Sequence, residues 1–293
     1  AEERRVALQE LAAAADDPAQ LAARAMLAGF YGEHPLGRPL RGTPAGLRAL
    51  TGSRLRALWA RDYPLGEAVL ALVGDFDLDA ALAQIGLLLG TGRKGHVRSD
   101  RSRSAPPAPP GRRERVLYKD GEQAHVALGF RGLRLGDPRE PTLDVLCAVL
   151  GGQSGRMFAA LREAEGLVYE ISVSSVEARD AGHVVVHAST SQDKLARARA
   201  AISAELERVA GGPVRADELQ RAQAWLIGQH ESGQQRRGRV ASALALAAAH
   251  GLDHARHFLY PRRVAAVTAP AACTLARQVF DPAHRVVGLV RAR

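Results

Sequence analysis

The chain has 293 residues, 46% of them hydrophobic, which is enough for two ordinary domains and excludes a disordered protein. Its net charge of +9 raises the question of nucleic acid, but Lys occurs only at Lys94, Lys119 and Lys194, and the Arg residues are scattered along the chain. Because a nucleic-acid binder needs a continuous basic surface, and because no apolar run reaches the length of a membrane span, we expect neither partner.

The first ninety residues are predicted to be mainly helical. Helices are expected over residues 2–15, 18–31 and 51–62, with Pro18 at the first position of the second and Thr43 and Pro44 opening a further short one. The apolar run Ala68–Val73 predicts a buried strand, and residues 78–89 predict another helix. Since the sequence lacks an initiator Met and begins inside a helical pattern, we expect it to be a fragment whose true N-terminus lies upstream.

A stretch rich in Pro and Arg separates two predicted domains. Residues 99–115 read as a linker between a first domain at 1–98 and a second at 116–293. In the second domain, the periodicity predicts strands at 116–118, 123–130, 167–175 and 182–189, and helices at 141–150, 195–210, 215–229 and 237–250. We therefore predict an α+β fold with antiparallel sheets flanked by helices.

An internal repeat links the two ends of the chain. Residues 51–73 match residues 268–290 without gaps at an offset of 217 positions (268 − 51). Residues 1 to about 74 therefore repeat the end of the sequence, which predicts two duplicated domains, the first of them incomplete at its N-terminus.

Arg162 and Tyr169 are the first candidates for a functional role. They lie seven residues apart across a predicted helix-to-strand turn at Gly166, so both side chains can face one cleft. A guanidinium fork and a phenol hydroxyl are well suited to holding a backbone carbonyl or a carboxylate. The alternative is structural, with Arg162 at a solvated helix end and Tyr169 half-buried in a strand.

Two carboxylates on the first helix are the next candidates. Glu3 and Glu10 are two helical turns apart and share one face. The repeat places Glu3 opposite Gln220 and Glu10 opposite the apolar Ile227, so the fold itself does not require a carboxylate at the second position. Glu10 is thus a candidate for chemistry confined to the first half, with a plain surface residue as the alternative.

Several His and Cys residues are weaker candidates. His183 and His187 face the same way on a predicted strand, but no third ligand accompanies them, which favours a structural role over a metal site. The segment His250–His254 contains Gly251, which should end the helix and separate the two imidazoles. Cys147 and Cys273 are predicted to be buried small hydrophobic residues.

Several blocks together resemble the pitrilysin-type zinc metallopeptidases, the inverzincins with an HxxEH motif. They include residues 4–10, the His34–Pro39 loop, the glycine-rich stretch 151–158 and the segment 161–169. Mitochondrial processing peptidase and insulin-degrading enzyme belong to this family. The resemblance implies the C-terminal portion of a two-domain member, built from duplicated processing-peptidase-like domains that enclose a chamber.

The resemblance also implies a role for each candidate residue. Glu10 matches the third zinc ligand, and Glu3 matches the acidic residue that supports catalysis. Arg162 and Tyr169 match the pair that binds the substrate backbone. The HxxEH segment itself is absent from these residues. We therefore expect zinc only in a complete protein that has the two His ligands, and we expect this chain alone to be inactive and free of zinc.

Two functional hypotheses remain. The first is a zinc-dependent metalloendopeptidase that hydrolyses peptides or unfolded proteins between two homologous halves. The alternative is a non-catalytic partner subunit that supplies Arg162 and Tyr169 to an active member of the family. A homodimer or a heterodimer with a related subunit fits either. The residues do not give the compartment, and a periplasmic or exported bacterial protein is the working hypothesis.

Overall fold

The computed structural model describes residues 2–90, 111 and 113–293. The first part contains α1 (Glu2–Asp16), α2 (Pro18–Tyr31), α3 (Pro44–Ala49), α4 (Gly52–Asp62) and α5 (Leu78–Leu89), with short 3-10 turns at Pro35–Gly37 and Leu65–Glu67. Side chains just before two of these helices fix their starts. Asp17 accepts a hydrogen bond from the Ala19 amide at 2.9 Å, and Thr51 accepts one from the Arg54 amide at 3.2 Å. The predicted helices of this part are confirmed.

The second part forms one sheet with helices. Its elements are β1 (Arg113–Tyr118), β2 (Gln123–Gly132), α6 (Glu140–Leu150), a π-helix (Phe158–Ala164), β3 (Glu170–Glu177), β4 (Gly182–Ser191), α7 (Leu195–Gly211), α8 (Ala216–Gln234), α9 (Arg237–Ala249), α10 (Ala255–Ala265), α11 (Ala269–Val279) and β5 (Val286–Arg291), the last preceded by a 3-10 turn at Pro282–His284. The strand order is β1-β5-β2-β4-β3. The α+β prediction is confirmed, with one difference, because β1 pairs with β5 in parallel.

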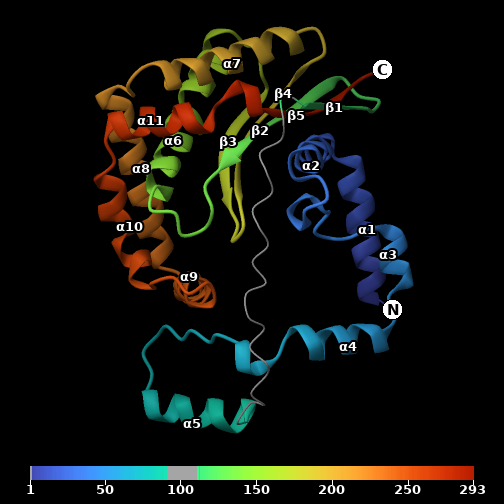
Figure 1. Ribbon diagram of the computed structural model, residues 1–293, viewed down its shortest axis with the longest axis vertical. Coiled ribbons are helices and arrows are strands. Elements are labelled where there is room, and N and C mark those ends of the chain that lie inside the picture. Colours follow the sequence, from blue (N-terminus) through green and yellow to red (C-terminus); the bar gives the residue numbers. More distant parts are fainter. Residues whose placement is uncertain (1, 91–110, 112) are drawn as a thin grey trace.

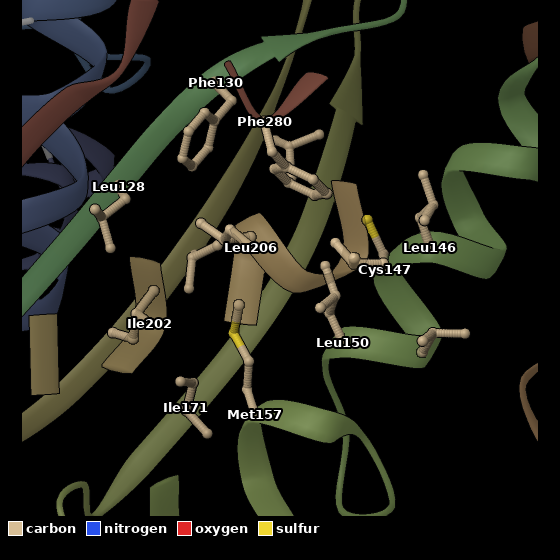
Figure 2. Packing of buried hydrophobic residues seen from close by; sticks show 14 of the residues in the cluster. Leu128, Phe130, Leu146, Cys147, Leu150, Met157, Ile171, Ile202, Leu206 and Phe280 are labelled. Atoms are coloured by element: carbon tan, nitrogen blue, oxygen red, sulfur yellow. The ribbon is translucent and has the colours of Figure 1, made fainter. Parts of the chain in front are cut away.

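One face of the sheet carries the main hydrophobic core. Alternate residues of β2 and β4, such as Val126, Leu128 and Val186, are buried there against α6, α7 and α11. Figure 2 shows Phe130 and Phe280 meeting in this core, with their ring centres 5.4 Å apart at nearly a right angle. Figure 1 shows the three helices gathered on that side of the sheet.

The opposite face is covered by α2, which comes from the first part of the chain (Figure 1). The approach is close because the sheet presents glycine beneath the helix. A Cβ atom on Gly288 of β5 would lie 2.0 Å from the Ala22 carbonyl oxygen and 2.6 Å from the Met26 nitrogen. Met26 is buried and its sulfur lies over Gly129 of β2. The helix backbone therefore rests almost directly on the sheet backbone.

Polar groups at the C-terminal end of α2 complete this contact. The Tyr31 hydroxyl lies 3.0 Å from Nδ1 of His183, which projects from β4. Burial and, to a lesser extent, the nearby Arg131 guanidinium together lower the pKa of His183 to about 4, so the imidazole is neutral at pH 7. Burial also raises the pKa of Tyr31 to about 12. The contact is thus a bond between two neutral groups.

The predicted buried strand at 68–73 is wrong for this structure. Residues 68–73 are extended but pair with no strand among the described residues, and Leu70 and Leu72 are 57% and 46% exposed. The neighbouring helices α4 and α5 lie away from the sheet in Figure 1, and they expose Trp59 and Leu87. A strand is stabilised by its partners, so an apolar run without any stays irregular.

The repeat seen in the sequence reappears in the order of the elements. The series α1, α2, α4 and the 65–67 turn corresponds to α8, α9, α11 and the 282–284 turn, and residues 69–74 then correspond to β5 at the offset of 217. The domain boundaries stay a prediction. Residues 99–110 and 112 of the proposed linker lie outside the described residues, and β1 already begins at Arg113.

None of the helices that the structure describes is both long enough and apolar enough to cross a membrane.

The contact beneath α2 can be tested by adding one methyl group. Gly288→Ala should lower the free energy of unfolding by about 3 kcal/mol, because the new Cβ meets backbone atoms that cannot move aside individually. Gly228→Ala is the matched control. Gly228 lies inside α8, where Ala is favoured over Gly, and a Cβ at this position would have no neighbouring atom within 4 Å. Urea unfolding of both variants measures the difference. Equal stability of the two would show that α2 does not rest on Gly288.

The burial of His183 makes stability depend on pH. His183 has a pKa near 4 in the fold and near its ordinary 6.5 when unfolded, so its stabilising contribution is complete above about pH 6.5. That contribution is lost as the pH falls from 6.5 to 4, and amounts to on the order of 3 kcal/mol. His183→Gln should flatten this part of the stability curve. Urea unfolding at a series of pH values between 4 and 8 measures the curve, and an unchanged slope in His183→Gln would contradict this role for His183.

Candidate functional site

The two carboxylates of the first helix lie on the exposed side of α1. Glu3 and Glu10 are both exposed, whereas Leu11 and Ala14 are the buried residues of this helix. Glu10 Oε2 lies 3.3 Å from Arg41 Nε, and about half of each side chain is exposed, 52% and 54%. An ion pair this exposed adds little stability. The fold therefore does not need either carboxylate for packing.

These residues do not by themselves fit a zinc ion. A catalytic zinc site takes three protein ligands, usually His and carboxylate. In the part of the chain that the structure describes, no group of three or more His, Cys, Asp or Glu residues is arranged to hold a metal ion. Glu10 has a guanidinium beside it instead of imidazoles.

The glycine-rich stretch after α6 is a structural connection. A Cβ on Gly155 would lie 1.9 Å from the Gly151 carbonyl oxygen, so only glycine fits this turn. Arg156 then makes two hydrogen bonds to the Glu218 carboxylate, at 2.8 and 2.6 Å, with both side chains largely buried. These bonds lower the pKa of Glu218, which also accepts from the Arg215 amide at the start of α8. The stretch ties the π-helix to α8.

Arg162 lies on the π-helix with an exposed side chain. Its guanidinium carbon is 5.1 Å from the centre of the Phe158 ring, a cation–π contact that orients it without pairing its charge. The helix ends in a tight turn, where Gly166 has a φ of +58° and the Leu167 amide donates to the Leu161 carbonyl at 2.7 Å. A π-helical turn is uncommon and often marks a functional position.

Tyr169 follows the same turn and is 53% exposed. Its backbone is held firmly, because its amide donates to the Ser189 carbonyl at 2.8 Å. Two residues earlier, the Leu167 carbonyl accepts from the buried Thr190 hydroxyl at 2.6 Å. The Lys194 ammonium donates to the Gly166 carbonyl at 3.0 Å. The backbone is therefore fixed on both sides of the turn while the phenol ring points outward.

The structure does not join the four predicted site residues by direct contacts. Among residues 2–90, 111 and 113–293, no hydrogen bond, ion pair or ring contact links Glu3 or Glu10 to Arg162 or Tyr169. The first two lie on α1, and the other two flank the turn before β3. All four side chains are exposed, and Glu10 alone of them has an ion pair among the described residues, with Arg41. Their common site stays a prediction.

The His residues of β4 have structural surroundings. His183 bonds to Tyr31, and His187 stacks on His125 of β2 with ring centres 5.8 Å apart. Burial is the largest cause lowering the pKa of both His125 and His187, so these imidazoles are held neutral. The helix α9 ends at Ala249 and Gly251 has a φ of +67°, which separates the imidazoles of the 250–254 segment as predicted.

A cavity of about 740 Å³ lies between α6, α8 and β3 and was not found from the sequence. It contains Asp144, whose pKa is raised to about 6 by burial even though the Tyr260 hydroxyl donates to it at 2.8 Å. Trp225 and the thiol of Cys147 line the same cavity. The only signal in the sequence was a single Asp inside the apolar pattern of residues 141–150.

The sequence of this chain is similar to that of known peptidase-family proteins. The model of the peptidase M16 inactive domain matches residues 49–226. A zinc protease of Mycobacterium leprae is 31% identical over 236 residues, which is 77% of this chain and 51% of that protein. This chain therefore spans about half the length of the curated relatives that it matches.

Solved structures share the fold. The peptidase M16 inactive domain from Pseudomonas fluorescens superimposes with a TM-score of 0.87 at 19% identity, over 100% of this chain and 70% of that one. A chain of complex III2 from Candida albicans gives a TM-score of 0.77 at 15% identity, over 99% and 70%. At these identities the likeness concerns the fold alone.

The Arg156–Glu218 connection should be important for stability. Arg156→Ala should lower the free energy of unfolding by about 3 kcal/mol, because it leaves the Glu218 carboxylate buried without its partner. The control is Arg215→Ala, which removes an ion pair to Asp217 whose side chains are 69% and 47% exposed and should cost less than about 1 kcal/mol. Chemical denaturation compares them. Equal losses would contradict a special role for Arg156.

Proposed function

This chain belongs to the peptidase M16 family, and on that premise we propose that it is the C-terminal portion of a zinc-dependent metalloendopeptidase that hydrolyses peptides between two homologous halves. The observation that carries the proposal is the presentation of Arg162 and Tyr169. Both side chains are exposed on either side of one turn, and the backbone of that turn is fixed by hydrogen bonds. Such a rigid arrangement is what a substrate-positioning site requires.

In this proposal the two residues hold the substrate backbone. The Arg162 guanidinium has no carboxylate partner among the described residues, so its donors are available for a peptide carbonyl or a carboxylate. The Tyr169 hydroxyl can donate a second hydrogen bond to the same peptide. Two donors on a fixed turn restrict the position and orientation of the peptide before cleavage, which reduces the entropic part of the barrier.

The metal part of the proposal concerns the whole protein. Glu10 is the proposed third zinc ligand, and Glu3 the acidic residue that supports the site. The described residues cannot bind zinc without two further His ligands. In this proposal the rest of the complete enzyme supplies those two His residues. The exposure of both carboxylates supports the proposal, because neither is needed for packing and the ion pair of Glu10 with Arg41 is itself exposed.

The second candidate is a non-catalytic partner subunit. The match to a domain described as inactive favours it, as does the likeness in fold to a chain of complex III2. In that case Arg162 and Tyr169 would act in a dimer with a related, active subunit. Export to the periplasm or beyond the cell stays a hypothesis for either candidate.

The test uses the whole protein that contains this chain. Combining Arg162→Ala with Tyr169→Phe should lower peptide turnover roughly a hundredfold, through lost positioning, while the zinc content stays unchanged. The control is Arg197→Ala, an exposed Arg with only a 3.8 Å contact to Glu165. Turnover is measured with a fluorogenic peptide and zinc by atomic absorption.

Three outcomes separate the candidates. Loss of turnover with zinc retained supports the enzyme. Turnover that appears only after a related subunit is added supports the partner role. Unchanged turnover in the double variant would return both residues to a structural role and would overturn the proposed site.

A further inference from the structure

A second cavity, of about 460 Å³, is open to solvent and is lined mainly by residues of α8, α9 and α10. Its apolar lining includes Leu226, Ala247 and Leu252, and Trp225 and Leu246 also line it with 55% of each residue exposed. Burial of an apolar group there would remove a large hydrophobic area from water. A cavity with one apolar side and a few convergent polar groups is the usual form of a ligand site.

The lining also includes Arg and His side chains. Arg239 of α9 has no ion-pair partner among the described residues, and its guanidinium is packed on the bare backbone of Gly233, where a Cβ would lie 2.8 Å from Cζ. His230 and His257 lie next to each other with ring centres 4.8 Å apart, and Gln234 bridges them with contacts of 2.9 and 3.3 Å. Burial is the largest cause that lowers the pKa of both imidazoles. The charge of Arg239 comes next for His257, whereas for His230 it follows the charge of His257.

The other charged groups near the cavity do not neutralise Arg239 and the two imidazoles. Arg256 of α10 is already paired with Glu140 of α6, and Arg263 donates to the Pro138 carbonyl at 3.2 Å. Asp144 of α6 accepts from Tyr260, and Glu231 of α8 is exposed. Arg239 and the two imidazoles therefore lack an acidic partner inside the cavity.

We propose that this cavity binds a carboxylate carried on an apolar group, and specifically the free C-terminus of a peptide that ends in an apolar residue. Arg239 would hold the carboxylate with its paired N–H donors, and the last side chain would pack against Leu226, Leu246 and Leu252. The choice of a peptide rests on the proposed function, which supplies peptides as substrates and products. The carboxylate chemistry does not depend on it.

Binding should be linked to protons. A carboxylate beside His230 and His257 favours the charged forms of the two imidazoles. The complex therefore binds more protons than the protein without ligand. Affinity should therefore increase as the pH is lowered from 8 to 6. Arg256, which is paired with Glu140, and Arg263 also line the cavity beside the imidazoles. Asp144, which accepts from Tyr260 and has its pKa raised to about 6, gains a proton in the same range, and the loss of its negative charge favours the carboxylate in the same direction.

The experiment measures binding to this chain without any turnover. The chain has two Trp residues, so Trp59→Phe leaves Trp225 as the sole fluorescent reporter, at the margin of the cavity. The probes are acetyl-Ala-Ala-Leu as the free acid, the same peptide as its C-terminal amide, and octanoate. The acid should bind at least tenfold more tightly than the amide, and Arg239→Gln should weaken the acid roughly tenfold.

Matched variants and probes give each outcome a meaning. Arg237→Gln, an exposed change on the same helix outside the cavity, should leave binding unchanged. Equal binding of acid and amide, or no binding of the acid, would overturn the proposal. Octanoate bound without the peptide acid would overturn the assignment to a peptide C-terminus. Because no cleavage is measured, these results do not depend on the proposed peptidase activity.

Discussion

The close contact of α2 with the sheet is the constraint on which the rest of the structure depends. A helix from the start of the chain lies on a sheet whose strands come from residues 113 to 291. It can do so because Gly288 offers no side chain beneath Ala22 and Met26. This contact buries the second face of the sheet, which a five-stranded sheet of this kind could otherwise leave in water. It also fixes α1, with Glu3 and Glu10, relative to the part that carries Arg162 and Tyr169.

The internal repeat shows how far tertiary partners decide local structure. Residues 69–74 and β5 occupy equivalent places in the two copies, yet β5 is buried between two strands and the first copy is extended and largely exposed. The two copies of the second helix differ as well, because α2 covers the sheet while α9 lines a cavity with α8 and α10. Similar patterns thus take different roles according to what lies beside them.

The Arg residues that hold the fold together differ from those of the proposed sites in whether a carboxylate pairs with their charge. Arg156 is buried with its charge matched by Glu218, so its donors are used within the fold. Arg162, only six residues later, is exposed and rests on an aromatic ring. Arg239 packs on the Gly233 backbone and likewise has no ion-pair partner among the described residues. Donors without an acidic partner are what a ligand requires, and Arg162 and Arg239 are two such positions in the described part of the chain.

The sequence by itself determined the type and order of most elements, the repeat and the family resemblance. These follow from local periodicity, from caps such as Thr51, and from motifs along one stretch of chain. Only the tertiary structure decided that α2 covers the sheet, that 68–73 is unpaired, and that Asp144 and Arg239 line cavities. Each of these depends on residues far apart in the sequence, whose proximity no local pattern records. The common site of Glu10 with Arg162 and Tyr169 is of the same kind, because it depends on how two halves of the whole protein meet.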